Sequence, residues 1–483
     1  MTMVISRLQK EIRGTKVTVV GLGRSGLGAA NLLAGMGADV TVTDMQSYDK
    51  LSDSAAKLSP LVKRALGSND ADCFHNPDVI IISPGVSPNI EPLAKAAARK
   101  IPVIGELELS YQVIQSHQKA QHIPFLSVTG TNGKSTTTTL LNHMLAKGGF
   151  ATLFGGNIGN ALTEEILRTM KSGEAGEERQ KLHYVVAEVS SFQLETIDQF
   201  KPHIAAILNI TPDHMDRYQS MSEYVNAKTR IFENQNQKDF LVLNADDPVV
   251  NEIKNRQLNL RRKKPKIIYF SRGKKVTGII CAGGKLYCAM PEHTDCDPQT
   301  PFIAENEIKI KGAHNLENAM AATAMALLAR CPLKAVIESL KEFEGLEHRM
   351  EFVRELEGVT YINDSKGTNV SAVARSLEGF QVPVILIAGG RDKDGAFSLL
   401  KGIIAQKVKG LILMGEASRK MKAVLGDVTA TILVESIEEA ITAAHTMAET
   451  GDVVLLSPAC ASFDMFKDFE DRGRQFKNKV MAL

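Results

Sequence analysis

Short apolar runs alternate with amphipathic or alanine-rich segments along most of the chain. In the first hundred residues, KVTVVGLG (16–23), ADVTVTD (38–44) and DVIIISPG (78–85) have the pattern of strands, and helical segments follow the first and the last of them. Continuous Val and Ile runs between helices are typical of parallel sheets that are covered on both faces. The pattern therefore predicts an α/β fold.

The same alternation starts again twice further along the chain. The segment HIPFLSVTGTNGKSTTTTLLNHMLA (122–146) predicts a strand, a glycine-rich loop and a helix, and small β-structure is expected around residues 261–310. More strand patterns separated by helices follow residue 346. A chain of 483 residues is too long for one ordinary core. We therefore expect three α/β domains in series, at residues 1–117, 118–345 and 346–483.

Composition and charge narrow the classes of function. Hydrophobic residues make up 44% and charged residues 23% of the chain, and the formal net charge is +2, so nothing draws the whole chain toward nucleic acid or an anionic membrane. No segment has the apolar core of a signal peptide or the length of a bilayer span. We therefore expect a cytoplasmic protein. The six cysteines form no CxxC pair, which favours reduced thiols over a zinc site.

The motif GTNGKST (130–136) carries the clearest chemistry. It follows a predicted strand and opens a predicted helix, so that backbone N–H groups and the helix N-terminus would favour a phosphate anion. Position 128 is Val, which makes this loop a shorter variant of the G-x-x-x-x-G-K-[ST] pattern. The alternative is a glycine-rich turn with a chance lysine. The residues predicted to bind ATP here are Gly130, Thr131, Asn132, Gly133, Lys134, Ser135 and Thr136, with Lys134 on the β/γ-phosphates and Ser135 or Thr136 near Mg²⁺.

A second glycine-rich turn, GLGRSG (21–26), fits the dinucleotide fingerprint because Asp44 ends the next strand. Asp44 could accept hydrogen bonds from a ribose or a uracil-bearing nucleotide, and SPG (83–85) could line the same crevice. Alone, the motif also fits a βα turn without a ligand. A nicotinamide-dependent oxidoreductase would explain it too, but would leave GTNGKST unexplained.

Two possible metal ligands lie at strand ends of the middle unit. Glu188 follows one strand and His214 another, and parallel strands would deliver both to the edge that carries the phosphate loop. Mg²⁺ keeps several waters and needs few protein ligands. For either residue alone a structural role is about as plausible as a functional one; together with the loop they predict a Mg²⁺–ATP site.

These motifs, in this order, resemble those of the Mur ligase family of ATP-dependent peptide-bond-forming enzymes. Within the family, NDSKGTN and ACASFDMF resemble the members that add D-glutamate to UDP-N-acetylmuramoyl-L-alanine. Another Mur-type or folylpolyglutamate-type ligase, with a different acceptor or amino acid, is the nearest alternative, and a nucleotide-gated binding module without chemistry is a further one. The matching strings are GTNGKST, GGNIGN (155–160), EVSSFQLE (188–195), NITPDHMDRY (209–218), LNADDP (243–248), GAHNLENAMAA (312–322), LEHRME (346–351), NDSKGTN (363–369) and SPACASFDMFKDFEDRG (457–473).

The resemblance implies one substrate for each domain: a Rossmann-like N-terminal domain for the UDP part, a central ATPase domain, and a Rossmann-like C-terminal domain for the amino acid. It implies Mg²⁺ as cofactor, ATP as co-substrate and an acyl-phosphate intermediate. We expect a monomer. For the UDP-linked substrate it indicates Arg24, Ser25, Asp44, Ser83, Gly85 and Asn157.

The same resemblance assigns the remaining site residues. Lys228 matches a lysine that the family carbamylates, which would turn a cation into an anion able to approach Mg²⁺. The implied metal set is Ser135, Glu188, His214 and Lys228, and the implied catalytic set is Lys134, Glu188, His214 and Lys228. Asn315, Asn318, Arg349 and Asp364 would complete the ATP site. The implied amino-acid-binding residues are Lys366, Thr368, Lys393, Ser462 and Phe469.

Overall fold

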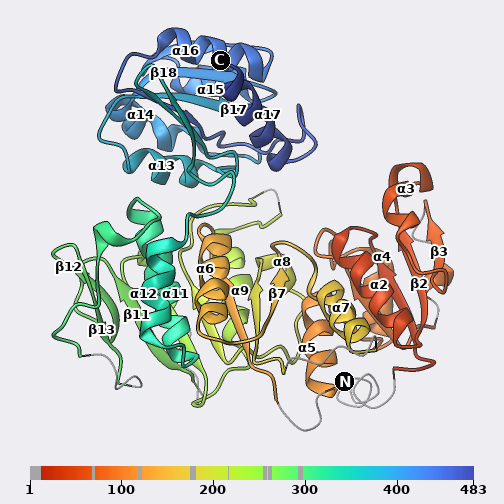
Figure 1. Ribbon diagram of the computed structural model, residues 1–483. Coiled ribbons are helices and arrows are strands. Elements are labelled where there is room, and N and C mark those ends of the chain that lie inside the picture. Colours follow the sequence, from red (N-terminus) through yellow and green to blue (C-terminus); the bar gives the residue numbers. More distant parts are fainter. Residues whose placement is uncertain are drawn as a thin grey trace.

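The computed structural model contains three sheets, one after another along the chain, each flanked by helices (Figure 1). It describes residues 12–67, 71–74, 76–117, 122–174, 181–215, 217–253, 258, 264–291 and 297–483. The predicted α/β class is confirmed. The predicted domain boundary at residue 118 falls in 118–121, outside the described residues.

The N-terminal sheet is fully parallel, in the order β3-β2-β1-β4-β5. The glycine-rich turn follows β1, the central strand. The strand order reverses at β1, which is where open α/β sheets form a crevice for ligands. The strands are β1 (Lys16–Val20), β2 (Asp39–Asp44), β3 (Lys63–Leu66), β4 (Val79–Ile82) and β5 (Val103–Gly105), and the helices are α2 (Arg24–Gly35), α3 (Tyr48–Ala56), α4 (Glu91–Ala98) and α5 (Glu106–His117).

The central sheet has the order β14-β13-β12-β11-β10-β9-β6-β8-β7. Near one edge β13 pairs antiparallel with both β12 and β14, and the other neighbours pair parallel. This edge is the small β-structure expected around 261–310. The strands are β6 (Phe125–Thr129), β7 (Thr152–Gly156), β8 (Tyr184–Glu188), β9 (Ile204–Ile207), β10 (Phe240–Asn244), β11 (Lys266–Ser271), β12 (Gly278–Ala282), β13 (Lys285–Ala289) and β14 (Ile303–Ala304). The helices are α6 (Lys134–Lys147), α7 (Leu162–Glu174), α8 (Ser191–Leu194), α9 (Met221–Thr229), α10 (Pro248–Ile253), α11 (Ala313–Leu328) and α12 (Leu333–Glu342).

The C-terminal sheet has the order β15-β16-β20-β17-β18-β19, with β15 antiparallel to β16. In Figure 1 this blue domain lies above the central domain, and α13 is its nearest helix to the central domain. The strands are β15 (Glu351–Leu356), β16 (Val359–Asn363), β17 (Val384–Gly389), β18 (Val408–Met414), β19 (Ala430–Leu433) and β20 (Val453–Leu456). The helices are α13 (Val370–Glu378), α14 (Lys401–Lys407), α15 (Ser418–Leu425), α16 (Ile437–Met447) and α17 (Phe469–Ala482).

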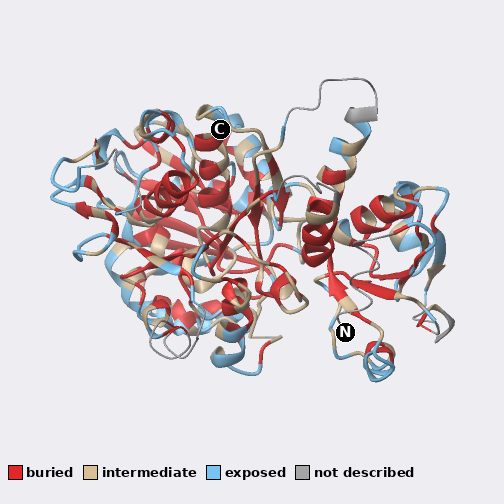
Figure 2. Cartoon of the chain, turned by 90° about the horizontal axis from the view of Figure 1, so that it is seen from below, coloured by how far each residue is buried: buried red, intermediate tan, exposed pale blue. Residues whose placement is uncertain are grey.

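Apolar cores lie on both faces of the sheets, as Val- and Ile-rich strands require (Figure 2). One core is continuous from the N-terminal sheet to one face of the central sheet and includes Leu107 of α5 and Leu162 of α7. The other face of the central sheet packs under α6, α11 and α12. No helix in the described ranges has the length and apolarity to span a membrane.

Candidate active site

The GTNGKST loop joins β6 to α6 at the carboxyl end of the central sheet. Two of its residues have to be glycine. Gly130 and Gly133 have φ of 152° and 83°, and a Cβ on Gly133 would lie 2.1 Å from Oδ1 of Asn318 on α11. Asn209, which follows β9, fixes the loop from the other side: its Oδ1 accepts from Asn132 N at 2.9 Å and its Nδ2 donates to Asn132 O at 3.0 Å.

Two lysines converge on one backbone oxygen of this loop. Lys134 Nζ donates to the carbonyls of Gly130 (3.0 Å) and Thr131 (2.8 Å), and Lys228 Nζ donates to Gly130 O at 2.7 Å. Lys228 comes from α9, is only 2% exposed, and lies 4.6 Å from the ring centre of Tyr224. Burial, with Lys134 nearby, lowers the pKa of Lys228 well below its ordinary value. Burial also lowers the pKa of Lys134.

Glu188 ends β8 beside the loop. Its Oε1 accepts from Asn157 Nδ2 at 2.7 Å, while its buried Oε2 has no hydrogen-bond partner in the described part of the chain. Burial alone would raise the pKa of Glu188, but Lys134 and Ser135 outweigh it and lower the pKa. An ionised carboxylate with a free oxygen beside a serine hydroxyl fits a hard cation such as Mg²⁺.

His214 lies in the loop after β9 and adopts φ of 58°, a backbone conformation that few non-glycine residues take. Its backbone N–H donates to Asp213 Oδ1 at 3.0 Å, and its ring packs edge-on against Phe192 with 4.8 Å between ring centres. Burial lowers the pKa of His214, which favours the neutral imidazole that can bind a metal. Among the described residues no three His, Cys, Asp or Glu side chains form a ready metal cage.

Seven of the eleven predicted ATP residues, from the central and C-terminal domains, line one small cavity of about 70 Å³; Gly130, Thr131, Lys134 and Ser135 are not in its lining. Arg349 Nη2 donates to Ser135 Oγ at 2.7 Å, so that a C-terminal-domain cation touches the phosphate loop. Asp364 Oδ2 accepts from Ser376 Oγ (2.8 Å) and Ser457 Oγ (2.7 Å), and burial raises the pKa of Asp364 to about 6. The lining includes Asn132, Gly133, Thr136, Asn315, Asn318, Arg349, Asp364 and Lys366.

The residues predicted to bind the amino-acid substrate are only partly brought together. Lys366 Nζ lies 3.5 Å from the ring centre of Phe469, and burial lowers the pKa of Lys366 to about 7. The backbone N–H of Thr368 donates to Lys366 O at 2.8 Å, and Ser462 is buried. Lys393 instead reaches across to the central domain. Its Nζ lies 3.3 Å from Asp213 Oδ1.

The predicted residues for the UDP part gather at the carboxyl edge of the N-terminal sheet. Asp44 accepts from Leu22 N at 2.7 Å, and Ser83 Oγ donates to Gly21 O at 2.8 Å, so both hold the GLGRSG turn. Arg24 Nη1 donates to Gly159 O of the central domain at 2.7 Å. At this edge Ser25 is half-buried and Gly85 is exposed, whereas Asn157 donates to Glu188 of the central domain. The UDP-binding roles stay predictions.

Several contacts at the site involve residues that the sequence analysis did not assign. Arg217 Nη1 donates to Pro84 O at 3.1 Å, and its guanidinium lies 4.3 Å from the ring centre of Phe192. It thus links the SPG loop of the N-terminal domain to the aromatic neighbour of His214. In the sequence, the only indication that Arg217, Phe192 and Asn209 contribute to the site was that they lie inside the motif strings.

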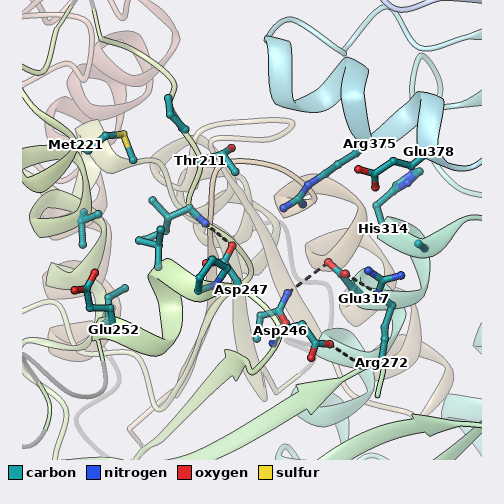
Figure 3. Close-up of a pocket in the computed structure, with 18 of the residues that line it drawn as sticks. Thr211, Met221, Asp246, Asp247, Glu252, Arg272, His314, Glu317, Arg375 and Glu378 are labelled. Carbon is teal, nitrogen blue, oxygen red and sulfur yellow. Dashed lines mark hydrogen bonds and ion pairs between the residues drawn. The ribbon is translucent and has the colours of Figure 1, made fainter. Parts of the chain in front are cut away.

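A larger cavity of about 880 Å³ adjoins the small cavity of about 70 Å³, between the central domain and α13. Figure 3 shows Arg375 extending from α13 into it, near His314 at the start of α11. On the same helix as His314, Glu317 Oε1 pairs with Arg272 Nε at 2.9 Å. Arg375 and His314 line both cavities, so the two are neighbours in one interdomain cleft.

Comparisons with known proteins agree with this geometry. The family models that match are the Mur ligase MurD-like N-terminal domain (residues 15–105), the Mur ligase middle domain (128–326) and the Mur ligase glutamate ligase domain (348–460). A protein named UDP-N-acetylmuramoylalanine--D-glutamate ligase from Geotalea daltonii is 44% identical over 477 residues, 98% of each chain. Another of that name, from Caldanaerobacter subterraneus, is 40% identical and covers 98% of this chain and 99% of its own.

Solved structures share the fold at low identity. UDP-N-acetylmuramate-alanine ligase MurC from Thermotoga maritima has a TM-score of 0.58 at 19% identity, covering 97% of this chain and 99% of its own. MurF ligase from the same organism has a TM-score of 0.58 at 15% identity over the whole of both chains. The three matched domains and the near-complete coverage of the relatives confirm the resemblance stated from the motifs: this chain belongs to the Mur ligase family.

Proposed function

We propose that this chain is an ATP-dependent, ADP-forming ligase that joins the amino group of D-glutamate to the alanyl carboxylate of UDP-N-acetylmuramoyl-L-alanine, in peptidoglycan precursor synthesis. The names of its relatives support the substrates. One observation in the structure carries the reaction type: Lys134 and Lys228 meet at Gly130 O beside the free oxygen of Glu188. That arrangement suits a triphosphate whose terminal group is transferred.

The reaction needs the alanyl carboxylate to be activated, because a carboxylate oxygen is a poor leaving group. In the proposed sequence this carboxylate attacks the γ-phosphate of ATP, giving an acyl phosphate and ADP. The amine of D-glutamate then attacks the acyl carbon, and phosphate leaves. Lys134 and Arg349 neutralise developing phosphate charge, and the N–H groups of the 130–136 loop orient the triphosphate.

Mg²⁺ would be held by Ser135, Glu188, His214 and a carbamate on Lys228. When bound there, it neutralises phosphate charge and helps orient the γ-phosphoryl group. The orphaned Oε2 of Glu188 and the neutral form of His214 support this set. The lowered pKa of Lys228 supports carbamylation, because CO₂ reacts with the neutral amine.

Carbamylation can be tested directly. Protein equilibrated with ¹³C-labelled bicarbonate should show a carbamate carbon resonance by NMR, and Lys228→Arg should lose it. Lys238→Arg, an exposed lysine beyond α9, is the matched control and should keep the resonance. A wild-type protein with full activity and no such resonance would rule the carbamate out.

The activity itself is tested by phosphate release with UDP-N-acetylmuramoyl-L-alanine, ATP and Mg²⁺. D-Glutamate should stimulate release, and L-glutamate, D-alanine and L-lysine should not. We expect the chain to act as a monomer in the cytoplasm, where ATP and nucleotide sugars are made. Stimulation by a different amino acid, or hydrolysis of ATP that no amino acid affects, would overturn the proposed substrate.

A further inference from the structure

Asp213 and Lys393 form an ion pair between two domains inside the proposed active site. Asp213 follows β9 of the central domain, and Lys393 follows β17 of the C-terminal domain. Lys393 Nζ lies 3.3 Å from Asp213 Oδ1, and the side chains are 22% and 10% exposed. Asn369 Nδ2 donates to the other oxygen, Asp213 Oδ2, at 3.0 Å. The carboxylate is therefore held by two groups of the C-terminal domain.

The same carboxylate lies next to the proposed metal ligand His214 and near the phosphate loop. Its Oδ1 accepts the backbone N–H of His214 at 3.0 Å. The Asn369 amide that holds it also lies 3.4 Å from Oδ1 of Asn132 in the phosphate loop. A group bound at Asp213 would thus lie between the phosphate loop and the residues that follow β17.

An amino acid carries the same two charges as this ion pair. If the carboxylate of the incoming amino acid pairs with Lys393, Asp213 loses its cation. A largely buried carboxylate is costly without a partner, and the ammonium group of a free amino acid supplies one. One ion pair is then replaced by two without a change in net charge.

We propose that Asp213 receives the ammonium group of the incoming amino acid, in the place that Lys393 fills in this structure. This inference rests on the proposed function, because it takes D-glutamate as the amino acid. It makes Asp213 a substrate-binding residue that distinguishes an amino acid from a plain dicarboxylic acid. It also orients the nitrogen that attacks the acyl carbon once the ammonium group has lost a proton to solvent; a second proton leaves as the amide forms and phosphate departs.

The test compares D-glutamate with glutarate, which has both carboxylates and no amino group. In Asp213→Asn the side chain keeps its shape and an acceptor for the His214 N–H. The KM for D-glutamate should rise about tenfold or more, while the KM values for ATP and the UDP-linked substrate stay within about twofold. The inhibition constant of glutarate should stay unchanged or fall, because Lys393 is released.

If Asp213 had only a structural role, Asp213→Asn would weaken the binding of D-glutamate and of glutarate to the same extent. That result would overturn the proposal. So would an unchanged KM for D-glutamate. Glu416→Gln is the matched control, because Glu416 loses the same charge from an exposed ion pair with Arg391 (3.1 Å); it should leave every constant unchanged. If the wild type shows no D-glutamate-dependent phosphate release, the proposed function fails instead, which separates the two failures.

A second measurement needs no variant. A crystal structure of the wild-type chain with D-glutamate should show the amino nitrogen within hydrogen-bond distance of Asp213, with Lys393 turned to a substrate carboxylate. D-Glutamate bound with the Asp213–Lys393 pair intact would overturn the proposal.

Discussion

At the scale of single residues, the Gly130 carbonyl explains why Lys134 and Lys228 lie so close. Each ammonium group donates to that oxygen. Burial lowers the pKa of Lys228, and repulsion from Lys134 lowers it further. One of the two would become an anion if Lys228 is carbamylated, which leaves Lys134 as the cation nearest the loop carbonyls. Lys134 is then the side chain that a triphosphate would draw away from Gly130 and Thr131.

Lys134→Ala should therefore abolish ADP release while leaving binding of the UDP-linked substrate largely intact. The reason is that the charge developing on the phosphate in the transition state loses the Lys134 cation that would neutralise it. The N-terminal domain, which would bind the UDP part, is unchanged. ADP release and calorimetric binding of the UDP-linked substrate measure the two effects. Lys147→Ala, at the other end of α6, should retain activity. Near-normal turnover of Lys134→Ala would contradict the mechanism.

Burial of Asp364 makes the free energy of unfolding depend on pH in a definite direction. The folded-state pKa of Asp364 is about 6 and lies above the ordinary value of about 3.9. The folded protein thus keeps a proton that the unfolded chain releases. The stabilisation is full below about pH 4 and is lost as the pH rises through 6, by roughly 3 kcal/mol in all.

Asp364→Asn removes this titration. The free energy of unfolding of the wild type, relative to the variant, should fall between pH 4 and pH 6, as urea denaturation at a series of pH values would measure. Asp427→Asn, which alters an exposed carboxylate of the same domain, should show no such step. A flat difference for Asp364→Asn would mean that its carboxyl ionises normally.

At the scale of elements, α5 fastens the N-terminal domain to the central domain with two buried glutamates. The Glu108 carboxylate accepts from the backbone N–H groups of residues 198, 199 and 200 at 2.8–3.1 Å. Glu106 accepts from Thr163 N at 2.8 Å, but its Oε2 is buried with no partner among the described residues, and burial raises its pKa.

The two glutamates should therefore respond differently to the same substitution. Glu108→Gln should cost about 1–3 kcal/mol in the free energy of unfolding, because backbone donors lose a charged acceptor. Glu106→Gln should cost less, since an amide resembles the protonated acid that burial favours. Thermal and urea denaturation of the pair measure the difference, and equal losses would contradict this assignment.

The elements themselves were largely predictable. The apolar run at 16–23 became β1, the loop at 130–136 opens α6, and the Ala-rich segment at 312–330 became α11, because local periodicity and glycine placement determine these. The Asp213–Lys393 pair was not predictable, since it joins loops 180 residues apart. The same holds for Arg217 with Pro84 and for Arg375 in the interdomain cleft. Such contacts depend on how domains dock, which no local pattern records.

At the scale of the whole molecule, one hydroxyl group joins the C-terminal domain to the phosphate loop. Ser371 Oγ on α13 accepts from Asn132 Nδ2 (2.9 Å), shares a hydrogen bond with Thr211 Oγ1 (2.8 Å) and donates to Asn369 Oδ1 (2.9 Å). Two of these partners belong to the central domain, and Asn132 belongs to the loop that would hold ATP. The position of the C-terminal domain is therefore coupled to the loop that is proposed to bind ATP.

Ser371→Ala should shift the chain toward forms in which the C-terminal domain is separated from the central domain. Each lost hydrogen bond contributes about 1 kcal/mol, so losing the two interdomain bonds should change the ratio of open to closed forms by tenfold or more. Small-angle scattering should report a larger radius of gyration than for the wild type. A non-hydrolysable ATP analogue with Mg²⁺ should reverse the change, because a ligand that contacts both domains favours the closed form.

The control for this comparison is Ser398→Ala, which removes a hydroxyl from an exposed serine of the same domain and should leave the radius unchanged. If Ser371→Ala scatters like the wild type, the remaining contacts at Asp213 and Arg349 suffice to hold the domains together. If it opens but the ATP analogue does not close it, the cleft is not the nucleotide site. Closure by the analogue in the variant would show that nucleotide binding can replace the Ser371 contacts, which makes domain closure a consequence of loading the site.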